Sequence, residues 1–111
     1  MNTKAPDWGH VIIWEFHARL GCEARFEEVY GPEGEWAQFF KSGAGYVRTE
    51  LNRDWKLPRR YVTLDFWTSR AAYVKFREAN LAEYGVLEQR SGALTEQEID
   101  LGSFERLPLK R

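Results

Sequence analysis

The sequence is poor in the residues that build metal and disulfide sites. Cys22 is the only cysteine, and His10 and His17 are the only histidines. A single cysteine excludes an internal disulfide and a thiolate metal cluster, and no His, Cys and carboxylate residues stand at ligand spacing. We therefore expect no metal site.

The short motifs of several enzyme classes are also missing. No nucleophile-elbow sequence is present, which argues against a Ser-His-Asp hydrolase. The glycine-rich segment GAGY at residues 43–46 belongs to an expected helix-to-strand loop. A dinucleotide site needs its glycines between a strand and a helix, so we expect neither a flavin nor a nicotinamide cofactor.

Long runs of one charge or of apolar residues are absent as well. The longest basic run is the pair Arg59–Arg60, and the formal net charge is −1. Because phosphate binding needs a concentrated basic face, nucleic acid is not an expected partner. No apolar run approaches the ~20 residues of a membrane span. The polar first ten residues lack the apolar stretch of a signal peptide, so the cytoplasm is the expected compartment.

Aromatic residues, in contrast, are abundant. They make up 15% of the 111 residues and include five Trp, which favours a core or cavity walled by rings. The length predicts one domain. We expect a flexible N-terminus over residues 1–9 and a single domain over residues 10–107.

Apolar periodicity predicts four strands and two helical regions. The strands are expected at residues 10–18, 46–53, 60–68 and 99–106. Helices are expected at residues 22–30 and 34–41, and a long helix is expected to begin after Ser69 as its N-cap. The order is that of a ferredoxin-like βαββαβ fold of the α+β class, with an antiparallel four-stranded sheet covered by helices on one face. The helix-facing residues are predicted to be Ile12, Trp14, Phe16, Val47, Leu51, Val62, Leu64, Phe66, Ile99 and Leu101.

The other face of this sheet is predicted to mix apolar and polar side chains. It would carry Val11, Ile13, Tyr46, Tyr61, Trp67 and Phe104 among Glu15, His17, Arg48, Glu50, Thr63 and Asp65. Such a face is too apolar to leave in water and too polar for a sealed core. Because closed two-fold dimers are the commonest assembly, we expect a homodimer through this open sheet face.

Several segments resemble the antibiotic biosynthesis monooxygenase domain family. These are VYGPEGEWAQFF, GAGYVRTEL, YVTLDFW and LTEQEIDLGSF, and the resemblance covers roughly residues 11–104. It implies a dimeric α+β barrel of ferredoxin-like protomers. Members of the family include cofactor-independent monooxygenases that oxidise polycyclic aromatic phenols or quinols with O2. Others degrade haem, and many have no known activity.

The resemblance does not extend to the haem-degrading members. They use an Asn on the first strand, and a Trp and a His on the long helix. Approximate alignment places these positions near Trp14, Phe76 and Val86, none of which matches. The phenol oxidases use a pocket of Asn, Trp, Tyr and Arg between sheet and helices, and Trp67 is similar to their strand-end Trp.

His17 and Asp65 are the predicted catalytic residues. Both are expected on one sheet face, on neighbouring strands, where a carboxylate beside an imidazole favours a general base near neutral pH. Such a base would remove the proton of a phenol before O2 reacts with the ring. The alternative is a structural polar contact across the dimer interface, with Arg48, Glu15 and Glu50 as further partners.

A flat aromatic ligand is the predicted occupant of a pocket between sheet and helices. A stripe of rings on a helix is more typical of plain core packing. Asn80 is included because a buried amide needs a partner, which a substrate hydroxyl would supply. The expected substrate-binding residues are Trp14, Trp67, Tyr73, Phe76, Asn80 and Tyr84.

Two functions therefore stay open from the sequence. One is a cofactor-independent monooxygenase that oxidises a phenolic or quinol-type substrate with O2. The other is a non-catalytic dimeric protein of the same fold that binds a small ligand or has a structural role. An open, ring-lined cavity with a polar group at its end favours the enzyme. A cavity filled by Trp14, Phe76 and Tyr84 favours the second.

Overall fold

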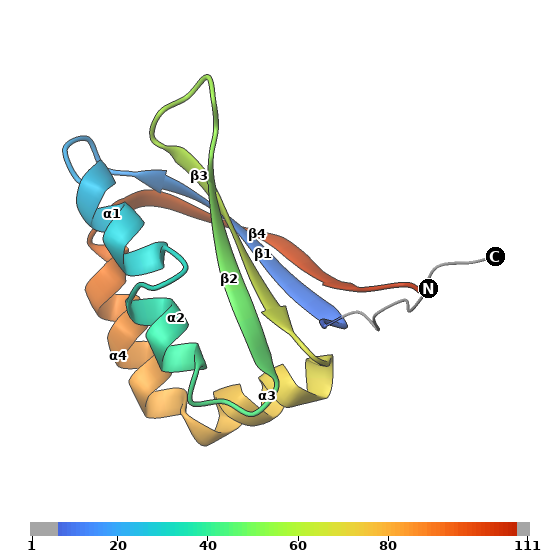
Figure 1. The fold of residues 1–111 in the computed structure, drawn as a ribbon. Coiled ribbons are helices and arrows are strands. Elements are labelled where there is room, and N and C mark those ends of the chain that lie inside the picture. The colour runs from blue at the N-terminus through green and yellow to red at the C-terminus, as the bar shows by residue number, and fades with distance from the viewer. Residues whose placement is uncertain (1–6, 109–111) are drawn as a thin grey trace.

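Four strands form one antiparallel sheet in the computed structural model, which describes residues 7–108. They are β1 (His10–Ala18), β2 (Tyr46–Arg53), β3 (Arg60–Trp67) and β4 (Thr95–Glu105). Their order across the sheet is β2-β3-β1-β4 (Figure 1), and β2 and β3 form the expected hairpin. The flexible segment predicted for residues 1–9 lies outside the described residues as far as residue 6.

The helices cover one side of this sheet (Figure 1). They are α1 (Glu23–Tyr30), α2 (Glu35–Phe40), α3 (Arg70–Ala79) and α4 (Leu81–Gly92). Ser69 caps α3 as expected, because its hydroxyl accepts a hydrogen bond from the Ala72 backbone N–H. The long helix predicted after Ser69 is interrupted at Asn80, whose φ of −131° is not helical. The ferredoxin-like α+β fold is confirmed.

The last strand begins four residues earlier than expected. Thr95 pairs with Ala18 and Gln97 pairs with His17, so residues 95–98 belong to β4. Their polar sequence, TEQE, is typical of a turn. On an edge strand, backbone pairing to a single neighbour is enough to form β structure, and exposed polar side chains are tolerated there.

The two faces of β3 are the reverse of those predicted. Tyr61, Thr63 and Asp65 stand opposite Phe16, Trp14 and Ile12 of β1, and Trp67 stands opposite His10. Residues paired across neighbouring strands share a face, so these side chains of β3 face the helices. Tyr61 and Trp67 are almost fully buried there. The prediction that Val62, Leu64 and Phe66 face the helices is wrong, because the rings of Tyr61 and Trp67 pack into the two aromatic clusters beneath the helices.

Irregular pairing also changes the faces of β2 and β4. A bulge between Tyr46 and Arg48 aligns Tyr46 with Trp67, so Tyr46 faces the helices instead of the open face. On β4, Ile99 pairs with Glu15, and a second bulge places Leu101 between paired positions. Ile99 therefore lies on the open face and Leu101 is 42% exposed, contrary to the prediction that both face the helices.

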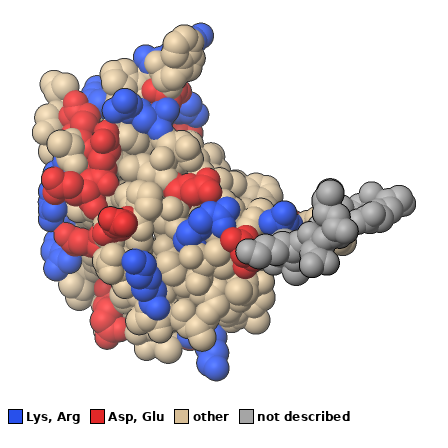
Figure 2. Space-filling model, viewed as in Figure 1, with Lys and Arg blue, Asp and Glu red and all other residues tan. Residues whose placement is uncertain are grey.

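The core beneath the helices is built almost entirely of rings. One cluster lies under α1, where Phe26 stacks on Tyr30 at 4.4 Å and contacts Tyr61 at 4.6 Å between ring centroids. A second cluster holds Phe40, Trp67 and Phe76, and Trp36 packs against both clusters. The outer surface of the helices carries intermixed acids and bases (Figure 2), including ion pairs of Glu35 with Arg25 and Arg90. Within residues 7–108, no helix is long and apolar enough to cross a membrane.

The turn before α2 depends on a close backbone approach at Gly34. A Cβ at this position would overlap the carbonyl oxygens of Glu28 and Val29. We expect Gly34→Ala to lower the free energy of unfolding by about 1–3 kcal/mol, which is typical of overpacking against groups that cannot move. Gly85, an exposed residue within α4, has no neighbouring atom within 4 Å of an added Cβ. Gly85→Ala should raise the same quantity by about 0.5–1 kcal/mol, because alanine favours the helix.

Urea unfolding of the wild type and both variants measures this difference. Effects of the same sign and size in the two variants would contradict the packing that the structure shows around Gly34.

Candidate functional site

A ring-lined cavity of about 110 Å³ lies between the sheet and the helices. Trp14 and Phe16 of β1 contribute rings from the sheet, and Trp36, Tyr73 and Tyr84 contribute rings from the helices. The charged side chains of Arg77, Glu88 and Glu98 also border it, and all three residues are exposed to solvent. The cavity therefore has an aromatic interior and a charged, solvent-exposed border.

Asp65 is the acidic group on the sheet side of this cavity. The Thr49 hydroxyl donates a hydrogen bond to Asp65 Oδ1 at 2.6 Å, and the Tyr46 hydroxyl lies 2.7 Å from the Thr49 oxygen. Because Thr49 gives its one proton to Asp65, it accepts from Tyr46, and the three groups form a directed chain. Burial raises the pKa of Asp65 to about 6, although the hydrogen bond from Thr49 opposes this shift.

Two tyrosine hydroxyls meet on the helix side of the cavity. The Tyr73 and Tyr84 oxygens are 3.0 Å apart, which joins α3 to α4 across the break at Asn80. Burial raises the pKa of Tyr84 above its usual range, and the neighbouring Tyr73 hydroxyl adds to the shift. The Tyr84 hydroxyl therefore stays protonated near neutral pH. The Arg77 guanidinium lies 5.0 Å from the centroid of the Tyr84 ring.

A further hydrogen bond joins α2 to α4. Trp36 Nε1 donates to Ser91 Oγ at 3.2 Å, and this hydroxyl donates in turn to the Leu87 carbonyl oxygen at 2.6 Å. Tyr30, which also lines the cavity, has its pKa raised to about 12 by burial. The walls therefore combine ring packing with hydrogen bonds between elements that are distant in sequence.

The structure places three of the predicted substrate-binding residues on the cavity. Trp14, Tyr73 and Tyr84 line it, and their role in binding stays a prediction. Trp67, Phe76 and Asn80 lie outside the lining, and their contact with a ligand stays a prediction. Trp67 and Phe76 are core residues, and the Asn80 amide donates to the Phe76 carbonyl oxygen at 2.8 Å.

Sequence reasoning missed Thr49 and Thr63 as cavity residues. Asp65 was assigned to the opposite face, so its pairing with Thr49 was not anticipated. The register of β2 on β3, which brings Thr49 opposite Asp65, carries no signal in a single sequence.

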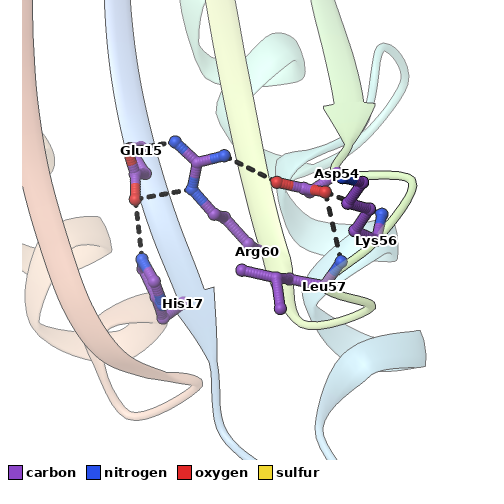
Figure 3. Close-up of polar contacts among 6 residues, drawn as sticks. All are labelled: Glu15, His17, Asp54, Lys56, Leu57 and Arg60. Atoms are coloured by element: carbon purple, nitrogen blue, oxygen red, sulfur yellow. Dashed lines mark hydrogen bonds and ion pairs between the residues drawn. The ribbon is translucent and has the colours of Figure 1, made fainter.

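The prediction that His17 and Asp65 lie together on one sheet face is wrong. His17 is opposite Arg60 in the β1–β3 register, whereas Asp65 is opposite Ile12, so the two side chains lie on opposite faces of the sheet. His17 Nε2 instead contacts Glu15 Oε2 at 2.7 Å (Figure 3). An imidazole on the open face cannot take a proton from a ligand beneath the helices.

Glu15 and Arg60 form the centre of a polar network on this open face (Figure 3). Arg60 Nε and Nη2 donate to the two oxygens of Glu15 at 2.9 and 3.0 Å, and Nη1 donates to Asp54 at 2.6 Å. Asp54 accepts the backbone N–H groups of Lys56 and Leu57 at 2.7 and 3.1 Å. The hydrogen bonds of Arg60 and then His17 lower the pKa of Glu15 to about 2. The network ties the β2–β3 loop to β1, which is a structural role.

No group of three or more His, Cys, Asp or Glu side chains within residues 7–108 is placed to hold a metal ion. The aromatic and carboxyl groups of the cavity are instead suited to hold a neutral aromatic molecule and to exchange a proton with it.

Comparison with solved structures shows the same fold in several proteins. SnoaB, a cofactor-independent oxygenase from Streptomyces nogalater, matches with a TM-score of 0.70 and 24% identity over 92% of this chain and 96% of that chain. A provisionally assigned antibiotic biosynthesis monooxygenase from Bordetella bronchiseptica matches with a TM-score of 0.68 and 21% identity, over 90% and 99% of the two chains. Another provisionally assigned antibiotic biosynthesis monooxygenase, from Deinococcus radiodurans, matches with a TM-score of 0.72 and 12% identity, over 92% of this chain and 96% of that chain.

These likenesses confirm the fold that the sequence resemblance implies. At such low identity, no residue role is transferred from these proteins to this chain. No protein-family model matches the sequence, and no curated protein matches it.

The raised pKa of Asp65 predicts a dependence of stability on pH. The carboxyl has a pKa of about 6 in the folded protein and about 3.9 when unfolded. The folded state therefore binds this proton more tightly, and the stabilisation present below about pH 4 is lost as the pH rises through about 6. Asp65→Asn removes this dependence. Relative to the wild type, the variant should gain about 2 kcal/mol of unfolding free energy between pH 4 and pH 7.

Urea unfolding of the wild type and Asp65→Asn at several pH values tests this expectation. Glu78→Gln, which changes an exposed carboxyl of α3, is the control. A stability difference between the wild type and Asp65→Asn that does not change with pH would show that Asp65 titrates normally.

Proposed function

We propose that this protein is a cofactor-independent oxygenase that oxidises a phenolic or quinol substrate with O2 in the cavity. The observation that carries the proposal is the position of Asp65, a carboxyl with a raised pKa beside an aromatic cavity. A strongly perturbed acid in a concave site is a candidate for proton transfer. The fold, shared with proteins that include a cofactor-independent oxygenase, supports the same reaction class.

Asp65 would act as the general base. At pH 7 a carboxyl with a pKa of about 6 is mostly ionised, so it is ready to accept the proton of a substrate hydroxyl. Proton transfer from a phenol, whose pKa is about 10, is uphill by about 1.4 kcal/mol for each unit of pKa difference. The raised pKa of Asp65 reduces this difference by about 2 units relative to an exposed carboxyl.

Loss of the proton makes the ring electron-rich enough to react with O2. The substrate anion transfers one electron to O2, and the resulting substrate radical and superoxide combine to form a carbon–oxygen bond at a ring carbon. The peroxide O–O bond then breaks. One oxygen stays on the ring as a carbonyl, and the other leaves as water with the ring proton and the proton held by Asp65. For a quinol, the products are a hydroxyquinone and water.

The aromatic walls would hold the substrate ring and exclude bulk water from the anion. Thr49 keeps Asp65 oriented through its hydrogen bond, and Tyr46 fixes Thr49. Arg60 and His17 take no part, because they lie across the sheet. The alternative function, ligand binding without turnover, uses the same cavity and differs only in the absence of O2 consumption.

Oxygen consumption with a panel of phenols and quinols tests the reaction. We expect Asp65→Asn to lower kcat by about 10²–10⁴-fold, the usual contribution of a general base. Thr49→Val should cause a smaller loss and shift the pH profile of kcat/KM, because it removes the hydrogen bond that opposes the rise in the pKa of Asp65. His17→Gln and Glu78→Gln are the controls and should retain turnover.

Full turnover in Asp65→Asn would exclude this residue as the base. Saturable binding of the panel without O2 consumption by the wild type would favour the non-catalytic alternative.

We also propose that two copies pair through the open sheet face. Ile13, Val62 and Leu64 stand side by side at its centre, and Phe104 at its edge is 50% exposed. Trp8 packs edge-on against Phe66 at 5.0 Å and shields only that end of the face. A contiguous apolar surface of this kind favours association with a second copy of the same chain.

Light scattering at micromolar concentration should give the mass of a dimer. Leu64→Glu places a charge in the centre of the face and should shift the protein towards monomer, whereas Ala71→Glu on the exposed surface of α3 should not. A wild type with the mass of one chain would exclude the dimer.

A further inference from the structure

We propose that the cavity selects a benzene-sized quinol, with two oxygens on one ring, in preference to a monophenol or a fused polycyclic phenol. This inference rests on the proposed function, since it names the substrate class of the same site. It departs from the polycyclic substrates that the sequence resemblance implies.

The volume of the cavity sets the first limit on the ligand, which concerns its size. At about 110 Å³ it is slightly smaller than the ~150 Å³ apolar cavities that accept benzene in other proteins. Pockets for drug-sized ligands are several times larger, roughly 300–1,000 Å³. One six-membered ring is therefore near the upper size that this space takes without movement of its walls.

The walls are tied together in a way that resists enlargement. The Trp36 ring lies 5.6 Å from Phe40 and 5.2 Å from Tyr84, between centroids. Its Nε1 is bonded to Ser91, and the hydroxyls of Tyr73 and Tyr84 are bonded to each other. A second fused ring held entirely between these walls would have to separate α2 or α3 from α4, which breaks one of these hydrogen bonds and the ring contacts around it.

Polar groups on two opposite walls set the second limit on the ligand, which concerns its hydrogen-bonding groups. On the sheet side, within the described residues, Asp65 receives one hydrogen bond, from Thr49 to Oδ1. Its second oxygen is therefore free to accept from a substrate hydroxyl. On the helix side, Tyr73 and Tyr84 share one hydrogen bond but carry two hydroxyl protons, so the pair has one proton left to donate.

The two walls face a common space. Both tyrosines and Asp65 line the cavity, and the charge of Asp65 contributes to the raised pKa of Tyr84. A ligand that fills this space needs a donor towards Asp65 and an acceptor towards the tyrosine pair. A quinol meets both requirements with its two oxygens, whereas a monophenol leaves one wall without a partner.

Anaerobic binding measurements separate this inference from the reaction. Quenching of tryptophan fluorescence reports occupancy, because Trp14 and Trp36 line the cavity. The probes are hydroquinone, phenol, naphthalene-1,4-diol and anthracene-9,10-diol. We expect hydroquinone to bind about tenfold more tightly than phenol, which lacks one hydrogen bond. We expect it to bind at least tenfold more tightly than either fused diol, for which the walls must separate.

Two variants assign the selectivity to particular groups. Tyr84→Phe keeps the ring but removes the hydroxyl pair, so hydroquinone and phenol should then bind within about threefold of each other. Trp36→Phe removes the bond to Ser91 and part of the ring volume, and should bring naphthalene-1,4-diol to within about threefold of hydroquinone. Trp55→Phe is the matched control, because Trp55 is 91% exposed in the β2–β3 loop and should leave every affinity unchanged.

Tighter binding of a fused diol than of hydroquinone by the wild type would overturn the inference, as would binding of none of the four probes. An undiminished preference for hydroquinone over phenol in Tyr84→Phe would remove the role of the tyrosine pair. The protein could instead bind hydroquinone selectively but consume no O2 after air is admitted. That result would reject the proposed function and still support the inferred ligand class.

Discussion

The register of β1 on β3 is the constraint on which the rest of the structure depends. It places Phe16 opposite Tyr61 and Ile12 opposite Asp65, and thereby turns the polar-looking side of β3 towards the helices. In this register the rings of Tyr61 and Trp67 join the two aromatic clusters beneath the helices. Because side chains alternate along a strand, Thr63 and Asp65 are carried under the helices with those two rings. Both residues line the cavity there.

Two carboxyl groups on neighbouring strands have pKa values shifted in opposite directions on the two faces of the sheet. Glu15, on the open face, receives two hydrogen bonds from Arg60, and its pKa falls to about 2. Asp65, on the helix side, receives only the neutral hydroxyl of Thr49 within the described residues, and its pKa rises to about 6. A carboxylate neutralised by arginine holds strands and a loop in place. A carboxylate left without a cation costs stability but keeps a proton-accepting oxygen available near neutral pH.

This contrast explains which parts of the molecule the sequence could predict. The order of elements, the faces of β1 and the cap at Ser69 follow from local patterns, and all three were predicted correctly. The alternation in β3 has two consistent interpretations, since Val62, Leu64 and Phe66 are as apolar as Tyr61 and Trp67. Choosing between them requires knowing which helix rings pack against each position of β3, and only the packed structure supplies that. The wrong choice paired His17 with Asp65, whereas Trp14, Tyr73 and Tyr84 were identified because rings at helical or strand spacing face the core in either case.

The hydrogen bonds between the walls also explain why a ring-lined space stays open at all. Aromatic side chains gain dispersion energy by closing a void, and an empty apolar cavity lowers stability in proportion to its volume. Here the rings that would close the space carry polar atoms with fixed partners, Trp36 on Ser91 and Tyr73 on Tyr84. Moving either ring into the cavity would leave a buried donor or acceptor unpaired, at a cost of about 1–3 kcal/mol. The polar tips of Trp36, Tyr73 and Tyr84 thus oppose closure of the space by the rings that carry them.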